Sequence, residues 1–435
     1  MAEEKDLMEK IVSLCKRRGF VFPGSEIYGG LANSWDYGPL GVELKNNIKK
    51  LWWDKFVRSR DDIVGIDAAL LMSSKVWEAS GHTATFNDPL VECKNCHERY
   101  RADQIDINAP CQNCGKKAFT EVKQFNMMFK TNLGPVENDE SVVYFRPETA
   151  QAMFVNFKNI LETSRKPVPF GIAQIGRALR NEITPGHFIF RTREFEQMEI
   201  EYFIKEEEWQ KYFEQWREEM KKWIFDDLKL KKSHVHELEV PDRERAHYSK
   251  KTVDFEFDFP FKRSELYGLA YRGDFDLKNH FKEAPYYDEE SRKKFWPHVI
   301  EPTWGVDRTF LAVLCEHFDD SNKERVVLHL PPKLAPYKVA VFPLLKNKPE
   351  LVAKAREIYS SLATSHLPLG PIAWDDRGNV GKRYYSQDEI GTPFCITVDF
   401  ESLEDGMVTV RDRDTKEQPR VKIEELEEYI RKSLQ

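Results

Sequence analysis

Apolar positions at helical spacing predict the first elements of the chain. Residues 7–15 place apolar side chains every three or four positions, and Gly19 follows as a stop signal. A second helix is predicted from about Val42 to Val57 and a third near Glu148–Leu161. Aromatic and apolar side chains then follow helical spacing from Trp209 to Ile224, which we interpret as core packing.

Two segments alternate their side chains between two faces in the manner of strands. Residues 253–261 put their phenylalanines on one face and acidic side chains on the other. Residues 195–203 place the following side chains on one face: Phe195, Gln197, Glu199, Glu201 and Phe203. Three polar groups in a row on one face either meet solvent or line a pocket, and the alternation favours neither.

The clearest boundary is the segment Leu330–Pro336. Its three prolines cannot lie inside a helix or a central strand, so it is predicted to be a linker. Beyond it, strands are predicted at 339–344, 394–400 and 407–410, with helices at Pro349–Leu362 and Val421–Leu434. This order predicts a small α/β domain.

Composition narrows the class of protein. Of 435 residues, 41% are hydrophobic and 32% charged, as in folded soluble proteins, and no apolar run is long enough for a transmembrane helix. The charged first six residues lack the apolar segment of a secretory signal, so a cytoplasmic location is expected. A net charge of −7 excludes a broadly basic surface but leaves room for a local RNA-binding stripe.

Four of the seven cysteines form two C-x-x-C pairs, Cys93/Cys96 and Cys111/Cys114. Four thiolates at this spacing complete a tetrahedral zinc site with no open position, so the expected zinc is structural. Redox thiols and a nucleic-acid-binding zinc ribbon are the alternatives. The remaining three lie in apolar stretches and are expected to be buried without a role, namely Cys15, Cys315 and Cys395.

The chemistry concentrates in residues 176–203. Arg180 and Glu182 lie two apart on a predicted strand, where an arginine can clamp a phosphate and a glutamate can accept from an amine. Pro185-Gly186 is predicted to return the chain antiparallel toward Phe195. The glycine-rich stretch 24–41 lacks the spacing of a phosphate-binding loop and favours tight turns around aromatic residues.

Residues 176–203 resemble motif 2 of the class II aminoacyl-tRNA synthetases, and residues 299–312 resemble motif 3. The resemblance implies an α/β fold in which an antiparallel sheet is flanked by helices. It implies that Arg180 holds the ATP α-phosphate and the substrate carboxylate, and that Arg308 binds the γ-phosphate; both would be the catalytic residues. The loop 184–191 would approach ATP and the tRNA acceptor end.

The same resemblance implies the rest of the ATP site. Glu182 would contact the adenine amine, Phe195 would stack on the ring, and Glu265 would help to hold Mg²⁺ on the bent ATP. The full set of implied ATP-binding residues is Arg180, Asn181, Glu182, Phe190, Arg191, Phe195, Glu265, Leu266, Gly305, Val306, Asp307 and Arg308. Motif 1, the dimer-forming element, is expected near Asp62–Lys75, but its usual proline is absent, so a homodimer rests on overall resemblance.

Several segments resemble the glycyl-tRNA synthetases in particular, among them 77–82, 145–151, 194–199 and 388–394, and the likeness covers nearly the whole chain. It implies that glycine binds to Arg101, Glu148, Phe195, Gln197, Glu199, Glu301, Thr303 and Gly305. Carboxylates suit an ammonium group, and crowding around Cα would exclude side chains. The family usually has serine at the position of Thr303, whose extra methyl group faces a tight pocket.

The implied layout is a catalytic domain over 1–330 with a zinc-ribbon-like insertion at 91–116 and a helical insertion at about 205–250. An anticodon-binding domain over 336–435 would read tRNA(Gly). Its candidate contacts, each of which could equally be solvated surface, are Arg377, Lys382, Arg383, Arg411 and Arg413.

Two other functions remain open. Another class II synthetase, for serine, threonine or proline, would share motifs 2 and 3. A catalytically inactive, synthetase-like nucleic-acid-binding subunit would share the fold. Four ATP residues argue against the inactive subunit, namely Arg180, Glu182, Glu265 and Arg308.

Overall fold

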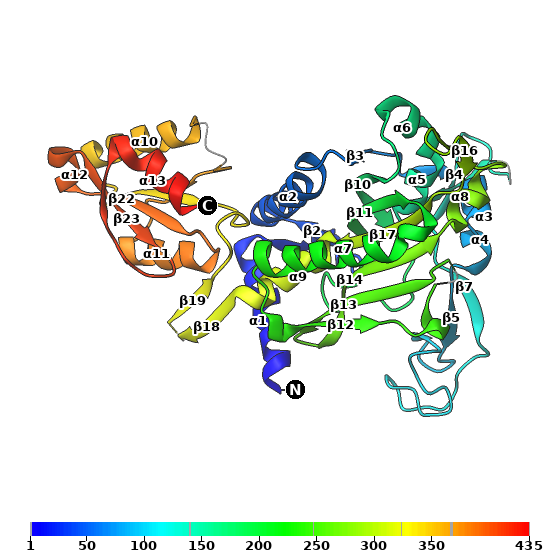
Figure 1. Ribbon diagram of the computed structural model, residues 1–435. Helices are drawn as coiled ribbons and strands as arrows, with labels where there is room; N and C mark the ends of the chain where they lie inside the picture. Colours follow the sequence, from blue (N-terminus) through cyan, green and yellow to red (C-terminus); the bar gives the residue numbers. More distant parts are fainter. Residues whose placement is uncertain (1, 139–140, 247, 323, 366–368, 435) are drawn as a thin grey trace.

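The computed structural model describes residues 2–138, 141–246, 248–322, 324–365 and 369–434. Its largest unit is a seven-stranded sheet in the order β12-β13-β14-β17-β11-β10-β3 (Figure 1). These strands are β12 (Val235–Glu239), β13 (Lys251–Phe259), β14 (Lys262–Gly273), β17 (His298–Gly305), β11 (Glu194–Ile204), β10 (Phe170–Leu179) and β3 (Ile63–Gly65). Every neighbouring pair is antiparallel except β10 and β3.

Helices cover one face of this sheet: α1 (Ala2–Arg18), α2 (Pro39–Trp53), α7 (Trp209–Lys222) and α9 (Val306–His317). Figure 1 shows α7 and α9 lying across the strands. The aromatic stripe of α7 is buried against them, which confirms that it is core packing; Trp216, for example, is 1% exposed. Trp304 from the sheet contacts Trp52 of α2 with ring centroids 5.3 Å apart.

The opposite face of the seven-stranded sheet is apolar at one end and polar at the other. In the β10–β11 register, Phe170 lies opposite Phe203 and Gln174 lies opposite Glu199. The apolar end is covered by α5 (Ala150–Val155), α6 (Phe157–Ser164) and α8 (Phe275–His280). The polar end lines a pocket with Gln197 and Glu199, so these polar side chains of β11 face a site and not bulk solvent, and Glu201 is fully buried.

Two local predictions were wrong in detail. The helix expected near 148–161 is split into α5 and α6 at Asn156, whose side chain donates to the carbonyl of Ala152. Such side-chain bonding competes with the helix. The strand predicted to carry Arg180 and Glu182 ends at Leu179, and the amide of Glu182 donates to the carbonyl of Arg180 in a tight turn.

Two small sheets lie beside the pocket. One contains β5 (Asn87–Glu92), β6 (Arg99–Arg101) and β7 (Lys123–Asn126); the other contains β4 (Leu71–Ser73), β9 (Val142–Phe145) and β8 (Lys130–Asn132). The short helices α3 (Ser74–Ala79) and α4 (His82–Thr85) join them. Three two-stranded sheets complete this part: β1 (Val21–Pro23) with β2 (Trp35–Tyr37), β15 (Tyr286–Asp288) with β16 (Lys293–Phe295), and β18 (Phe318–Asn322) with β19 (Arg325–Leu328).

The C-terminal unit is a five-stranded sheet in the order β21-β20-β22-β23-β24 with its own core. Along the chain its elements are β20 (Val339–Pro343), α10 (Pro349–Ala363), β21 (Ala373–Trp374), α11 (Val380–Glu389), β22 (Phe394–Val398), α12 (Phe400–Asp405), β23 (Met407–Asp412), β24 (Arg420–Lys422) and α13 (Leu426–Ser433). The closing helix was predicted too long, because Val421 pairs with Val408 as a strand. Helix α11 was not predicted, because its buried positions include Arg383 and Asp388 and leave no apolar stripe.

The linker has no helix or strand, as predicted, but it is packed and not loose. Leu330 and Leu334 belong to the main core, Ala335 is buried, and Asn47 donates to the carbonyl of Ala335 at 2.9 Å. Asp388 of α11 pairs with Arg325 of β19 at 2.7 Å. This ion pair connects the C-terminal unit to the unit that contains the seven-stranded sheet. Among the helices that the structure describes, none is long and apolar enough to cross a membrane.

Three candidate anticodon contacts are structural instead. Arg383, Arg411 and Arg413 are buried, so they are neither solvated nor free to meet a nucleic acid. Arg383 donates to the carbonyl of Pro343, Arg411 pairs with Asp388, and Arg413 donates to the carbonyl of Leu330. Arg377 and Lys382 remain exposed.

Candidate active site

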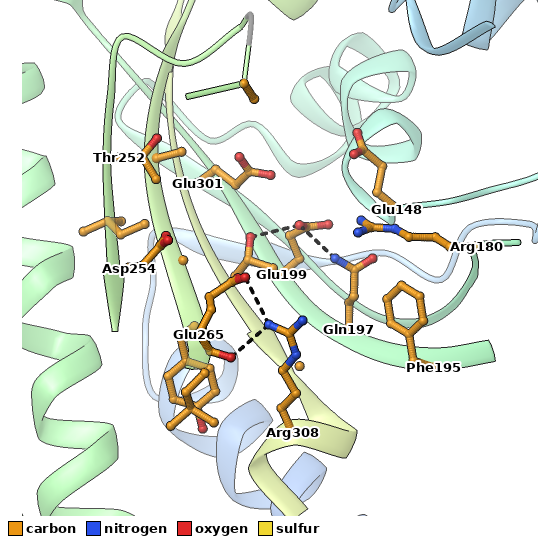
Figure 2. Close-up of a pocket in the computed structure, with 18 of the residues that line it drawn as sticks. Glu148, Arg180, Phe195, Gln197, Glu199, Thr252, Asp254, Glu265, Glu301 and Arg308 are labelled. Carbon is orange, nitrogen blue, oxygen red and sulfur yellow. Dashed lines mark hydrogen bonds and ion pairs between the residues drawn. The ribbon is translucent and has the colours of Figure 1, made fainter. Parts of the chain in front are cut away.

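One open pocket collects most of the sequence-predicted site residues. It lies over the ends of β11, β13, β14 and β17 and the segments that follow β10 and β12. Figure 2 shows Arg180 and Phe195 on one side of this space, Arg308 beside Glu265 below, and Glu199 and Glu301 between and above them. The pocket thus has a half-exposed end and a buried end.

Arg180 is held by contacts that leave part of its guanidinium unused. Its Nε donates to the carbonyl of Pro147 at 2.9 Å, and the guanidinium lies 5.3 Å from the centroid of the Phe195 ring and 5.4 Å from that of Phe86. An aromatic wall beside a fixed arginine suits a flat base next to a phosphate.

Arg308 follows Gly305 at the start of α9 and reaches back over β14. It pairs with the carboxylate of Glu265 at 3.1 Å and covers the ring of Phe190 at 4.5 Å. The Arg308 guanidinium lowers the pKa of Glu265, so this carboxylate stays ionised. Burial together with Glu265 raises the pKa of nearby Asp254 to about 7. Two carboxylates on adjacent strands supply the hard oxygen ligands that Mg²⁺ prefers.

Not every predicted ATP contact faces the pocket. Glu182 does, paired with Arg191 at 2.6 Å. Asp307 lines it, but its oxygens are occupied by the hydroxyl of Tyr37, the ammonium of Lys45 and the amide of Glu196. Asn181 and Val306 do not line it, and Val306 is buried in the core. Leu266 and Gly305 lie in its wall.

Glu148 is the ionised carboxylate of the buried end. It is 6% exposed, lies 3.2 Å from His82 and accepts from the Gln151 amide at 3.1 Å. Burial opposes ionisation, but His82, Arg272 and Arg180 hold the pKa of Glu148 well below its usual range.

Glu199 is fixed by hydroxyl groups. Thr149 and Thr303 both donate to it, the latter at 2.9 Å, and Gln197 lies at 3.5 Å. Burial and the neighbouring Glu148 raise the pKa of Glu199. Thr303 therefore keeps the hydroxyl contact that a serine would make. Arg101, in contrast, pairs with Asp88 and Asp103 on the cysteine-bearing unit and does not line the pocket.

A buried network that the sequence did not reveal supports Glu301. Arg272 is fully buried, donates to both carboxylate oxygens of Glu301 at 2.9 and 3.0 Å, and binds Asp276 with its other nitrogens at 2.8 Å. Gln151 donates to Asp276 at 3.0 Å and so connects this group to Glu148. Only the spacing of Arg272 and Asp276, four residues apart, hinted at a pair, and such pairs are common in surface helices.

The segment between β12 and β13 supplies a further wall, which the sequence did not predict. Residues 240, 244–246, 248 and 249 of this segment line the pocket, together with Thr252 at the start of β13. Tyr248 lies over Arg272, with the guanidinium carbon 3.7 Å from the ring centroid. Arg245 donates to the carbonyls of Val240 and Lys250 and closes the segment into a loop.

The four clustered cysteines converge. Cys93 and Cys114 have their sulfurs 3.6 Å apart, Cys96 and Cys111 3.7 Å apart, and one sulfur from each of the four lies within 4.8 Å of every other. A tetrahedron with zinc–sulfur bonds of about 2.3 Å has edges of about 3.8 Å. His97 and Gly115, with φ of 58° and 71°, close the two turns by donating to the carbonyls of Cys93 and Cys111.

Comparison with known proteins agrees with this geometry. Residues 129–318 match the tRNA synthetase class II core domain (G, H, P, S and T), and residues 338–433 match the anticodon binding domain. Fold and site thus define a class II tRNA synthetase.

Full-length relatives narrow the class. A glycine–tRNA ligase of Geobacillus thermodenitrificans is 49% identical and aligns over 100% of both chains. That of Alkaliphilus oremlandii is 50% identical over 100% of both, and that of Lachnospira eligens 50% identical over 97% of this chain and 98% of its own. The chain belongs to the glycine–tRNA ligase family. This membership confirms the resemblance and the fold class inferred from the sequence.

Proposed function

We propose that this chain uses ATP to activate glycine and joins it to tRNA(Gly). The observation that carries the proposal is a single pocket with a half-exposed arginine and aromatic end, formed by Arg180, Phe195 and Arg308, and a buried carboxylate end, formed by Glu148, Glu199 and Glu301. A nucleotide suits the first end and a small ammonium ion the second.

Two steps follow. The glycine carboxylate attacks the α-phosphorus of ATP and pyrophosphate leaves; the terminal ribose hydroxyl of tRNA then attacks the adenylate carbonyl and AMP leaves. Arg180 is assigned to the α-phosphate and Arg308 to the γ-phosphate, where positive charge stabilises the transition state. Glu265, with Asp254 beside it, would hold the Mg²⁺ that neutralises phosphate charge when ATP is bound.

Amino-acid-dependent exchange of labelled pyrophosphate into ATP tests the first step. We expect exchange with glycine and none above background with serine, threonine or proline. Exchange with serine but not glycine would assign the chain to another specificity, and none with any amino acid would favour an inactive nucleic-acid-binding subunit. Charging of a tRNA(Gly) transcript tests the second step.

The cysteine cluster is proposed to hold one structural zinc ion, and the reduced thiolates it needs suit a cytoplasmic location. Metal analysis of the purified chain is expected to find one zinc per chain. Cys114→Ser should lose it, whereas Cys315→Ser, at a half-buried cysteine outside the cluster, should keep it. A Cys114→Ser chain that retains full zinc would contradict the site.

We propose the domain layout expected from the sequence, 1–330 followed by 336–435, with the ribbon at 91–116. The insertion at about 205–250 contributes strand β12 to the sheet as well as helix α7. A homodimer is also proposed. Large apolar side chains stand exposed at Ile27 and Tyr28, 88% and 87% respectively, and light scattering should give twice the mass of the 51.2 kDa chain.

A further inference from the structure

Three buried carboxylates meet at the buried end of the pocket. Glu199 and Glu201 from β11 and Glu301 from β17 each place one oxygen within 4.8 Å of the others. Glu201 is fully buried, and neither of its oxygens has a hydrogen-bond partner among the described residues. The sequence placed Glu201 on the same face of its strand as Gln197 and Glu199 but gave it no role.

The charge around Glu201 is unbalanced. It is faced by Glu301 from β17, Glu199 from its own strand, Asp276 from α8 and Arg272 from β14, while its neighbour on β10 is the apolar Ile172. Arg272 is the one cation in this group, and Asp276 and Glu301 already use its nitrogens. If all four carboxylates were ionised, one guanidinium would face four negative charges.

Such a cluster lowers its free energy by keeping protons. An ionised carboxylate that is buried without hydrogen bonds is costly, and carboxylates that share a site hold a proton between them. Burial and Glu301 raise the pKa of Glu201 well above its usual value. Burial, together with Glu199 and Glu148, raises the pKa of Glu301 to about 8 in spite of Arg272.

We propose that Glu201 and Glu301 share one proton in the glycine-free enzyme and that the ammonium group of glycine displaces this proton on binding. The inference rests on the proposed function. At the buried carboxylate end one positive charge enters with the ammonium group and one proton leaves to the buffer, so the charge of that end stays constant, while the glycine carboxylate lies toward Arg180. Glu201 acts through Glu301 as a positioning residue, because it supplies negative charge only when the ammonium group is present.

The sign of the pH dependence follows from the proton released. The glycine-bound state holds one proton fewer, so raising the pH favours binding. We expect the association constant of glycine to rise about tenfold per pH unit below about pH 8, where the raised pKa of Glu301 lies, and to level off above it. Glycine itself remains an ammonium ion over this range.

Calorimetry counts the proton directly. Glycine is titrated into the full-length chain at pH 7.5 in phosphate, HEPES and Tris, which differ in ionisation enthalpy. The observed enthalpy plotted against buffer ionisation enthalpy should give about one proton released per glycine. Release of no proton would overturn the proposal. Failure to bind glycine or to support exchange would instead count against the proposed function.

Glu201→Gln keeps the shape of the side chain and removes its titration. We expect proton release to fall well below one, because Glu301 no longer shares its proton with a second carboxylate, with a shallower pH dependence and, at pH 8, glycine binding about tenfold weaker. Glu194→Gln, at an exposed position of the same strand, should still release about one proton. An unchanged proton count in Glu201→Gln would overturn the role of Glu201. Should that variant not fold, the buffer series on the natural chain and the pH dependence of its glycine KM still decide.

Discussion

The nucleotide end and the amino-acid end of the pocket are built in opposite ways. Arg180 and Arg308 are only partly buried and pack against aromatic rings; Arg180 donates to one carbonyl and Arg308 pairs with Glu265, so both guanidinium groups remain within reach of a phosphate. At the other end the carboxylates are buried, and all but Glu201 are already hydrogen-bonded. Preorganisation is therefore greatest where the substrate is smallest, because glycine offers few atoms to distinguish it.

The largest expected effect separates the two ends by stability. Arg272→Met leaves Asp276 and Glu301 buried without their cation, so the free energy of unfolding should fall by about 3–5 kcal/mol. Arg308→Met breaks a half-exposed pair with Glu265 and should cost less than about 1 kcal/mol. Urea unfolding followed by tryptophan fluorescence measures both, and equal losses would refute the contrast.

Activity, unlike stability, should depend strongly on an arginine of the nucleotide end, Arg180. Arg180→Ala removes charge aimed at the reacting phosphate, so kcat for glycine-dependent pyrophosphate exchange should fall by about 100- to 1,000-fold with the unfolding midpoint almost unchanged. Arg177→Ala, at an exposed residue paired with Glu194, is the matched control and should keep nearly full activity. A loss below about tenfold for Arg180→Ala would remove it from the catalytic role.

Glu148→Gln tests whether the buried end binds glycine alone. Loss of a charged acceptor costs about 1.5–3 kcal/mol, so the glycine KM should rise about 10- to 150-fold while the ATP KM changes less than about twofold. Because the pKa of Glu148 is lowered, the group is ionised throughout the neutral range, and the comparison is made above pH 8, where the proton held by Glu301 contributes least. A parallel rise of both KM values would show that the two ends are not separate.

The smallest effect concerns the methyl group of Thr303. Thr303→Ser keeps the hydroxyl that donates to Glu199, so the glycine KM should change less than about threefold. The freed space should increase alanine-dependent exchange by about tenfold, since one methyl group in a pocket is worth about 1–3 kcal/mol. Unchanged discrimination against alanine would mean that the wall lies elsewhere, with Tyr248 the next residue to test.

The sequence by itself determined the features that depend on spacing. Alternation along residues 195–203 assigned each side chain to a face, the two C-x-x-C pairs defined the cysteine cluster, and fixed motifs indicated Arg180 and Arg308. Local sequence also gave the α7 stripe and the linker, because a period of 3.6 and a run of prolines act within a few residues.

Tertiary structure alone decided which charges meet. Arg272 binds Glu301 across neighbouring strands, and His82 of α4 contacts Glu148, which lies just before α5. No spacing in the chain marks either pair. Arg413 was a candidate surface contact in the sequence, but in the structure its guanidinium donates to two backbone carbonyls in the interior. The reason is physical: the state of a charged side chain is set by burial and by its neighbours in space, and a linear pattern records neither.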